Sequence, residues 1–209
     1  MKKHLQIQPE WFRREDESPD PLFFTEPRLV VHVDDATIEA ARAYFEEALP
    51  ADGALLDLMS SWRSHLPSSI RSHVVGLGMN DVELSENPQL HERIVHDINA
   101  HPTTSLADAR FDAAIVTVSV QYMTRPVEIF REVCRMLKPG VRFHVLFSRR
   151  VFPTKVVAIW NSLPTARKRA ELIATYFADG GDWEEPEFLD RSPGRRADPL
   201  YVVRAAKRR

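Results

Sequence analysis

The stretch FDAAIVTVSVQYMTRPVEIFREVCRMLKPG, residues 111–140, decides the fold of this chain. It opens with an apolar run, residues 113–118, that is rich in β-branched side chains and typical of a strand buried on both faces. Pro126 stands where a helix would begin, because its fixed φ suits a first helical position. One apolar helical face follows it: Ile129, Val133, Met136 and Leu137. The sequence Lys138-Pro139-Gly140 then ends the helix.

A second apolar run, residues 141–147, follows directly, so the unit predicts a right-handed parallel βαβ crossover. Elsewhere we expect helices over residues 34–48, 154–160 and 164–177, and strands over residues 54–58, 73–78, 93–96, 187–189 and 200–205. This alternation predicts the α/β class: a single doubly wound, mostly parallel seven-stranded sheet of the Rossmann-like type, formed by residues 34–209.

Residues 1–33 form a separate N-terminal arm in this interpretation. Its first 28 residues are polar, interrupted by prolines and without helical or strand periodicity, but they carry Trp11, Phe12, Phe23 and Phe24. Two interpretations stay open: an arm that packs on the domain through its aromatic side chains, or a lid over a pocket.

Composition narrows the class of protein. The 209 residues are 44% hydrophobic, and 28 Lys+Arg against 30 Asp+Glu give a net charge of −2, which favours neither nucleic acid nor an anionic membrane. One cysteine, Cys134, cannot form an internal disulfide, which fits a reducing compartment. No apolar run approaches the roughly 20 residues that span a bilayer. The first residues also lack the apolar core of a signal peptide. We therefore expect a soluble cytoplasmic protein.

Ligands of open α/β sheets bind outside the carboxyl ends of the strands. The candidate loops are residues 59–65, 78–81, 97–99 and 119–122. The order of features around them resembles the class I S-adenosylmethionine-dependent methyltransferases: an FD-led strand, a helix with E-V-x-R and an L-K-P-G turn. The resemblance covers about residues 54–148. LLDLMSSWRSHLP, VVGLGMN and TVSVQYMTRPVEIF look like a little-characterised branch of that superfamily. The resemblance implies methyl transfer from S-adenosylmethionine to an acceptor that the sequence does not identify, with a small molecule expected.

The family's first motif is only partly present. An apolar strand with its acid, Asp57, is there, but residues 59–63 replace the glycine-rich loop that normally lets the backbone approach the cofactor. The resemblance places Ser60, Ser61 and Trp62 at the cofactor, where the two hydroxyls can donate to its carboxylate. The alternative is a collapsed loop that no longer binds it.

The family's second and third cofactor-binding positions are matched unevenly in this sequence. Gly78 stands where the family has an acid that holds the ribose hydroxyls, with Met79 and Asn80 beside it, and Asn80 can supply one hydrogen bond. Asp97 and Ile98 correspond to the residues that face the adenine. Asp97 is equally well interpreted as a loop acid or a helix cap.

The remaining candidates lie near the reacting methyl group. Ser119 and Val120 follow the fourth strand, and Tyr122 and Trp62 either wall a small pocket or pack on the surface. The acceptor side is expected at Phe152, Lys155 and Trp160, with Phe23 and Phe24 closing over it. Positioning supplies most of the rate of methyl transfer, so no catalytic residue is assigned. The candidate bases are His65, His73, His96 and His144, and none has a specific signal.

Other functions have weaker support. Gly76-Leu77-Gly78 is part of a dinucleotide fingerprint, but Asp81 replaces its third glycine. A Ser-His-Asp hydrolase lacks the G-x-S-x-G elbow. His91, His96 and His101 are spaced by five, which does not place them on one helical face for a metal site, and the basic tail at residues 204–209 is a weak argument for nucleic acid. The serious alternative is a catalytically inactive methyltransferase-like binding or interaction module, which the missing loop glycines and the missing ribose acid favour.

Overall fold

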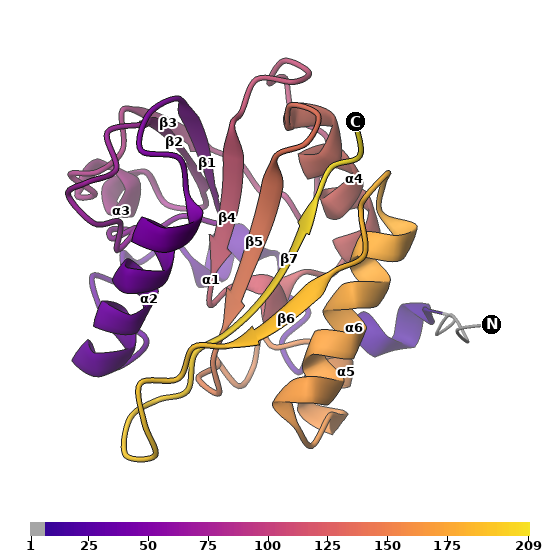
Figure 1. The fold of residues 1–209 in the computed structure, drawn as a ribbon. Coiled ribbons are helices and arrows are strands. Elements are labelled where there is room, and N and C mark those ends of the chain that lie inside the picture. Colours follow the sequence, from indigo (N-terminus) through magenta and orange to yellow (C-terminus); the bar gives the residue numbers. More distant parts are fainter. Residues whose placement is uncertain (1–6) are drawn as a thin grey trace.

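The computed structural model describes residues 7–209, and its centre is one seven-stranded sheet in the order β3-β2-β1-β4-β5-β7-β6 (Figure 1). The strands are β1 Ala54–Leu58, β2 His73–Gly78, β3 Glu92–Val95, β4 Ala113–Thr117, β5 Arg142–Phe147, β6 Glu187–Asp190 and β7 Tyr201–Ala206. Strands β1 to β5 pair in parallel, and β7 runs antiparallel to both β5 and β6. The predicted fold class, with its parallel pairing of the fourth and fifth strands, is confirmed.

The helices are η1 Pro9–Phe12, α1 Asp20–Phe23, α2 Asp35–Ala48, α3 Asp81–Ser85, η2 Val120–Tyr122, α4 Pro126–Met136, α5 Ala158–Ser162 and α6 Ala166–Asp179. Asp34 caps α2 by accepting a hydrogen bond from the Thr37 amide at 2.9 Å, as a helix start with this residue type predicts. The chain of residues 7–209 contains no helix that is both long and apolar enough to cross a membrane.

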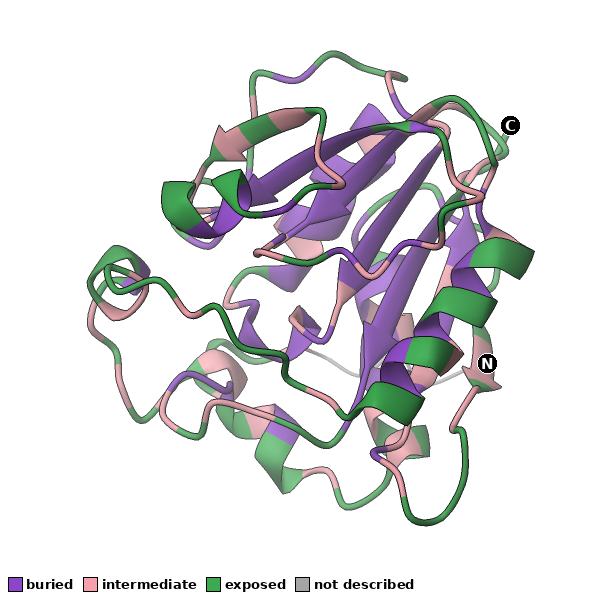
Figure 2. Ribbon diagram, turned by 90° about the vertical axis from the view of Figure 1, so that its left-hand side faces the viewer, coloured by how far each residue is buried: buried purple, intermediate pink, exposed green. Residues whose placement is uncertain are grey.

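Alternate side chains of the central strands enter two different cores, one on each face of the sheet. On β5, Phe143 and Phe147 pack with Phe130 of α4 and Phe177 of α6, whereas Leu146 packs with α2 on the other face. The central strands are therefore almost wholly buried, whereas exposed residues lie on the outer faces of the helices, in the loops and on the edge strands β3 and β6 (Figure 2). The two-residue period of a strand produces this division.

The prediction of a helix over residues 154–160 is wrong for the first part of that segment. Helix α5 begins only at Ala158, because the residues before it hold the N-terminal arm instead. The amide of Asp16 donates to the carbonyl oxygen of Thr154 at 2.9 Å, and the amide of Ala158 donates to that of Arg13 at 2.8 Å. The short helices η1, α1 and α3 were not predicted either, because four or five residues are too few to show a period.

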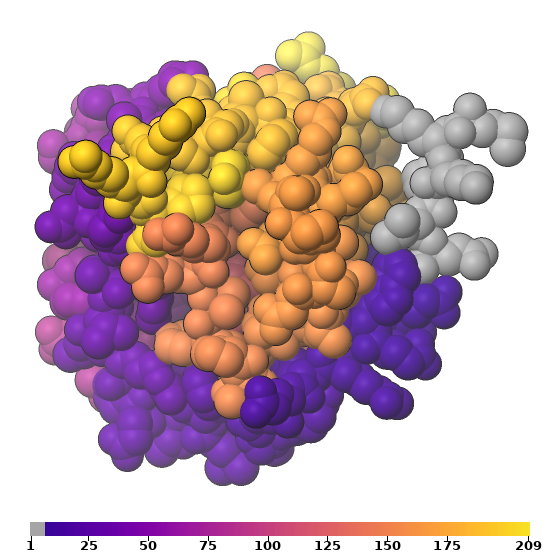
Figure 3. Space-filling view, turned by 90° about the horizontal axis from the view of Figure 1, so that it is seen from below, coloured from indigo at the N-terminus to yellow at the C-terminus, as the bar shows by residue number. Residues whose placement is uncertain are grey.

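Residues 7–33 spread across the face at the carboxyl ends of the parallel strands. Figure 3 looks onto this face and shows the indigo N-terminal chain beside the orange chain that follows β5. The ring centroids of Phe12 and Tyr176 are 6.1 Å apart, and those of Phe23 and Phe152 are 5.6 Å apart. The arm thus contacts the domain through its aromatic side chains at two separate places.

A buried lysine fixes the middle of the arm. Lys155 is 1% exposed, and its Nζ donates to the carbonyl oxygen of Ser18 at 2.7 Å and lies 3.1 Å from the Asp16 carboxylate and 3.4 Å from that of Asp20. Arg14 pairs with Asp20 at 2.6 Å. A buried charge needs such partners, because an unpaired charge in the interior is costly.

Replacement of the lysine should release the arm. We expect Lys155→Met to lower the free energy of unfolding by about 3 kcal/mol, because it leaves Asp20 with less compensating charge. Hydrogen exchange at the Ala158 amide should accelerate. Lys168→Met is the matched control, since Lys168 forms an exposed pair with Glu171 on α6. Equal exchange rates at Ala158 in both variants would contradict the assignment.

Candidate functional site

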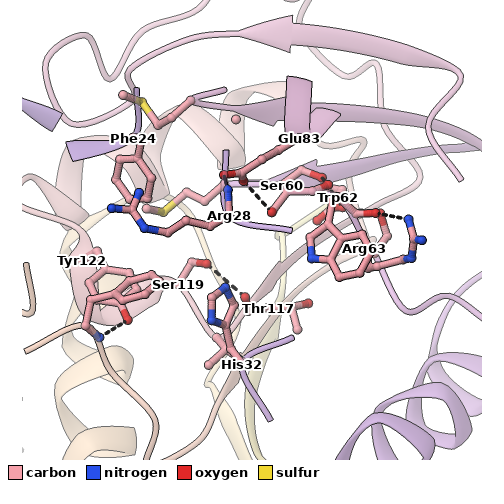
Figure 4. Close-up of a pocket in the computed structure, with 18 of the residues that line it drawn as sticks. Phe24, Arg28, His32, Ser60, Trp62, Arg63, Glu83, Thr117, Ser119 and Tyr122 are labelled. Carbon is pink, nitrogen blue, oxygen red and sulfur yellow. Dashed lines mark hydrogen bonds between the residues drawn. The ribbon is translucent and has the colours of Figure 1, made fainter. Parts of the chain in front are cut away.

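The loops after β1, β2, β3 and β4 line one cavity together with the arm (Figure 4). Twelve predicted site residues line it: Asp57, Ser60, Ser61, Trp62, Gly78, Met79, Asp97, Ile98, Ser119, Tyr122, Phe152 and Lys155. Three others do not. Asn80 caps α3 and donates to the carbonyl oxygen of Phe24 at 2.8 Å, whereas Val120 and Trp160 are each 1% exposed within the core.

The loop after β1 is folded tightly against the end of β2. The Ser60 amide donates to the carbonyl oxygen of Leu77 at 2.8 Å. A Cβ atom added at Gly78 would lie 2.2 Å from the carbonyl oxygen of Ser60. An acid therefore has no room at position 78 while the loop keeps this path. The glycine at position 78 and the path of the loop are two parts of one arrangement.

Three cavity residues other than glycine have a left-handed backbone conformation. The φ angles are 54° at Met59, 57° at His65 and 52° at Val118. Each costs roughly 1 kcal/mol for a residue that has a Cβ atom. Met59 occupies part of the loop where the family has glycine, so the chain retains a glycine-like backbone there with another side chain.

The acid of the first motif lies under this loop. Asp57 is 3% exposed, and its Oδ2 accepts hydrogen bonds from Ser60 at 2.7 Å and Ser64 at 2.6 Å. Burial raises the pKa of Asp57 to about 6, although both hydrogen bonds act to lower it. The Ser60 hydroxyl, predicted to face a cofactor, is therefore committed to Asp57.

The Ser61 hydroxyl is committed to a residue that the sequence analysis did not select. It donates to Oε2 of Glu83 at 2.6 Å, and the amide of Arg28 donates to Oε1 at 2.7 Å. Glu83 lies on α3, is 7% exposed and lines the cavity. The pattern Asn80-x-x-Glu83 signals a helix start, because an N-cap followed by Glu at the third position marks a first turn, but it does not indicate that the carboxylate faces a cavity.

The other polar predictions have local partners as well. Oδ1 of Asp97 accepts from the amides of Asn99 and Ala100, both at 3.0 Å, so this oxygen has the loop role that was one of the two interpretations. The Tyr122 hydroxyl accepts from the Phe152 amide at 2.7 Å, and burial raises its pKa. Tyr122 therefore stays protonated near neutral pH.

The four candidate bases separate into two groups. His65 and His96 line the cavity. His73 is largely exposed on β2, and His144 is 1% exposed in the core, where its Nδ1 lies 2.6 Å from the Tyr44 hydroxyl. Burial lowers the pKa of His65 to about 4. A fifth histidine, His32 of the arm, lines the cavity and was not among the candidates.

Comparison with known proteins agrees with this fold. Residues 61–145 match the family model described as a methyltransferase domain. The fold is that of solved methyltransferases. The chain has the class I methyltransferase fold.

Three solved structures illustrate the likeness. The [4+2]-cyclase SpnF is 14% identical, with a TM-score of 0.60 over 90% of this chain and 93% of its own. An S-adenosylmethionine-dependent methyltransferase from Thermotoga maritima is 13% identical, with a TM-score of 0.60 over 82% and 89%. The geranyl diphosphate C-methyltransferase from Streptomyces coelicolor is 15% identical, with a TM-score of 0.55 over 81% and 80%. No curated protein sequence matches the chain. At these identities the comparison establishes the fold of this protein.

The contact between Gly78 and Ser60 gives a first test of the site. Gly78→Ala should lower the free energy of unfolding by about 2 kcal/mol, because a backbone carbonyl must move to admit the methyl group. Gly76→Ala is the matched variant on the same strand, where the nearest atoms belong to the flexible side chain of Leu90. Urea denaturation should show the larger loss for Gly78→Ala, and an equal loss would contradict the packing described.

The pKa of Asp57 gives a second test. The folded-state value of about 6 lies above the ordinary 3.8, so the protonated form is favoured by folding. The stability of the fold that depends on protonated Asp57 is fully present below about pH 4 and is lost as the pH rises through 6. Between pH 4 and pH 7.5, Asp57→Asn should therefore gain about 3 kcal/mol of stability relative to wild type. Asp52→Asn, at an exposed surface acid, is the control. A pH-independent difference would show that Asp57 does not titrate in this range.

Proposed function

We propose that this protein is an S-adenosylmethionine-dependent methyltransferase whose cofactor binds in the cavity and whose acceptor is a small molecule. The observation that carries the proposal is that all four loops at the carboxyl ends of β1 to β4 line one cavity. Solved proteins of the same fold bind this cofactor class, since the geranyl diphosphate enzyme is complexed with S-adenosylhomocysteine. We place the reaction in the cytoplasm, as the lone Cys134 predicts.

The cofactor supplies a methyl group already activated on a sulfonium, so the protein has mainly to align it with the acceptor. In this proposal the loops after β1, β2 and β3 hold the cofactor, with Asp57, Trp62, Met79, Asp97 and Ile98 around it. Ser119 lies toward the methyl group, and Tyr122 and Phe152 lie on the acceptor side. The arm covers both halves.

We further assign the role of the missing acid to Glu83. Position 78 has no room for a side chain, yet a buried carboxylate reaches the same cavity from α3, one turn further along the chain. Its two oxygens already accept one hydrogen bond each, from a hydroxyl and from an amide. Two acceptor oxygens on one group suit a pair of neighbouring hydroxyls such as those of a ribose.

Calorimetric titration with S-adenosylhomocysteine tests both statements. Wild type should bind, and Glu83→Gln should weaken binding about tenfold or more, because a hydrogen bond to a charged group contributes roughly 1.5–3 kcal/mol. Glu86→Gln is the control, since Glu86 is an exposed residue at the end of α3 and does not line the cavity. Unchanged affinity in Glu83→Gln would reject the role of Glu83 and leave the function standing.

The second candidate is a methyltransferase-like binding module without catalysis. It is favoured by the committed hydroxyls of Ser60 and Ser61, which have intramolecular partners. The fold alone does not decide, because one protein that shares it is named as a [4+2]-cyclase. If wild type shows neither heat nor a thermal shift with millimolar S-adenosylhomocysteine, the methyltransferase proposal fails and the binding module replaces it.

A further inference from the structure

The imidazole of His32 is a cavity group with unused hydrogen-bonding capacity. In Figure 4 it points into the same space as Ser119 and Tyr122. Its ring stands edge-to-face on Phe152, with the ring centroids 5.1 Å apart and the planes at 83°. Across residues 7–209, neither ring nitrogen has a hydrogen-bond partner. The nitrogens of His32 are therefore available to a ligand.

The backbone around His32 is held on both sides. Before it, the Arg28 amide is bonded to Glu83, and the carbonyl oxygen of Val30 accepts from Nε1 of Trp62 at 2.8 Å. After it, Asp34 accepts from the amides of Thr37 at 2.9 Å and Asp198 at 2.6 Å. Only the side chain of His32 is unbonded, so its position is set by the backbone and by the Phe152 ring.

Several other titratable groups of the cavity are less suited to take a proton. Tyr122 is protonated, and both oxygens of Glu83 already accept hydrogen bonds. The ammonium of Lys155 is bonded to the arm, and Nε2 of His96 lies 2.6 Å from the carbonyl oxygen of His101. His65 faces the guanidinium groups of Arg42 and Arg63, which disfavour an added positive charge.

The titratable groups that face His32 are Glu83, Arg28 and His65. Partial burial lowers the pKa of His32 below 6.5, and Arg28 acts in the same direction, whereas Glu83 opposes it. The imidazole is therefore neutral at pH 7, with one nitrogen that can accept a proton.

The surroundings of His32 define the ligand that it would meet. Oγ1 of Thr117, at the end of β4, is buried and has no hydrogen-bond partner in the described chain, although it lines the cavity. Such an orphaned hydroxyl marks a place for a polar ligand atom. The rings of Phe24, Tyr122 and Phe152 line the same cavity. A polar hydroxyl in a cavity that also has flat aromatic rings suits a planar ring that carries a hydroxyl group.

We propose that His32 is the proton acceptor of this site and that the methyl acceptor is a flat aromatic molecule with an ionisable hydroxyl group. The inference rests on the proposed methyltransferase function. His32 takes the hydroxyl proton as the acceptor oxygen forms its bond to the methyl carbon. The bond between that carbon and the sulfur breaks, the sulfur keeps the electron pair, and the positive charge passes from the sulfonium to the imidazolium.

The probe for this proposal is 4-nitrophenol, whose absorbance reports its own ionisation. It is added to the full-length protein saturated with S-adenosylhomocysteine, and its spectrum is followed against pH. Bound probe should ionise at a pH about one unit lower in wild type than in His32→Gln, because glutamine can form a hydrogen bond but cannot hold the proton. His73→Gln, at an exposed histidine outside the cavity, should reproduce the wild-type curve.

Affinity for S-adenosylhomocysteine should be the same in wild type and His32→Gln, which shows that the variant keeps its fold and its cofactor site. Identical ionisation curves for wild type and His32→Gln would overturn the role of His32. Failure of the cofactor-loaded wild type to bind 4-nitrophenol would overturn the acceptor class and the role together. Failure of wild type to bind S-adenosylhomocysteine at all is a different result, which removes the methyltransferase function itself.

Discussion

The site depends on one backbone contact, between the loop after β1 and the end of β2. The Ser60 amide donates a hydrogen bond to the carbonyl oxygen of Leu77. The carbonyl oxygen of Ser60 lies so close to Gly78 that no Cβ atom fits at that position. With the loop in this path, the Ser60 hydroxyl reaches Asp57 and the Ser61 hydroxyl reaches Glu83. The path of the glycine-poor loop therefore requires the glycine at the end of β2. In our proposal, Glu83 of α3 takes the role of the acid for which position 78 has no room.

The arm completes the cavity because buried polar contacts hold it there. Lys155 binds residues 16–20 to the chain after β5, and Asn99 joins the same cluster by donating to Asp20 at 2.9 Å. Such contacts need good geometry to offset the desolvation of the charges, and this favours one defined position for the arm. That position brings Arg28 to Glu83 and His32 to Phe152. The packing of residues 7–33 thus determines two of the groups to which we give functional roles.

Sequence patterns predicted the sheet well, because the central strands are apolar runs and Pro126 and Pro139 mark the helix between them. They also selected most of the cavity lining, since topology alone brings the carboxyl ends of parallel strands together. The sequence patterns did not identify Glu83 and His32, and the reason is physical. Each is presented by a tertiary contact, the first by the path of the loop after β1 and the second by the anchored arm. Trp160 was predicted to line the site but does not, because its helix turns the ring against Phe147 in the core.

The order of the strands explains why the polar and apolar halves of the cavity meet where they do. From β1 the chain builds the sheet outward to β2 and β3, and then returns to place β4 on the other side of β1. The crevice of a doubly wound sheet lies at this reversal. The carboxylates of Asp57, Glu83 and Asp97 lie toward β1, β2 and β3, whereas the rings of Tyr122 and Phe152 follow β4 and β5. Thr117 and Ser119 stand at the boundary, and His32 reaches it from the arm. In our proposal, the reaction between the charged cofactor and the aromatic acceptor takes place at that line.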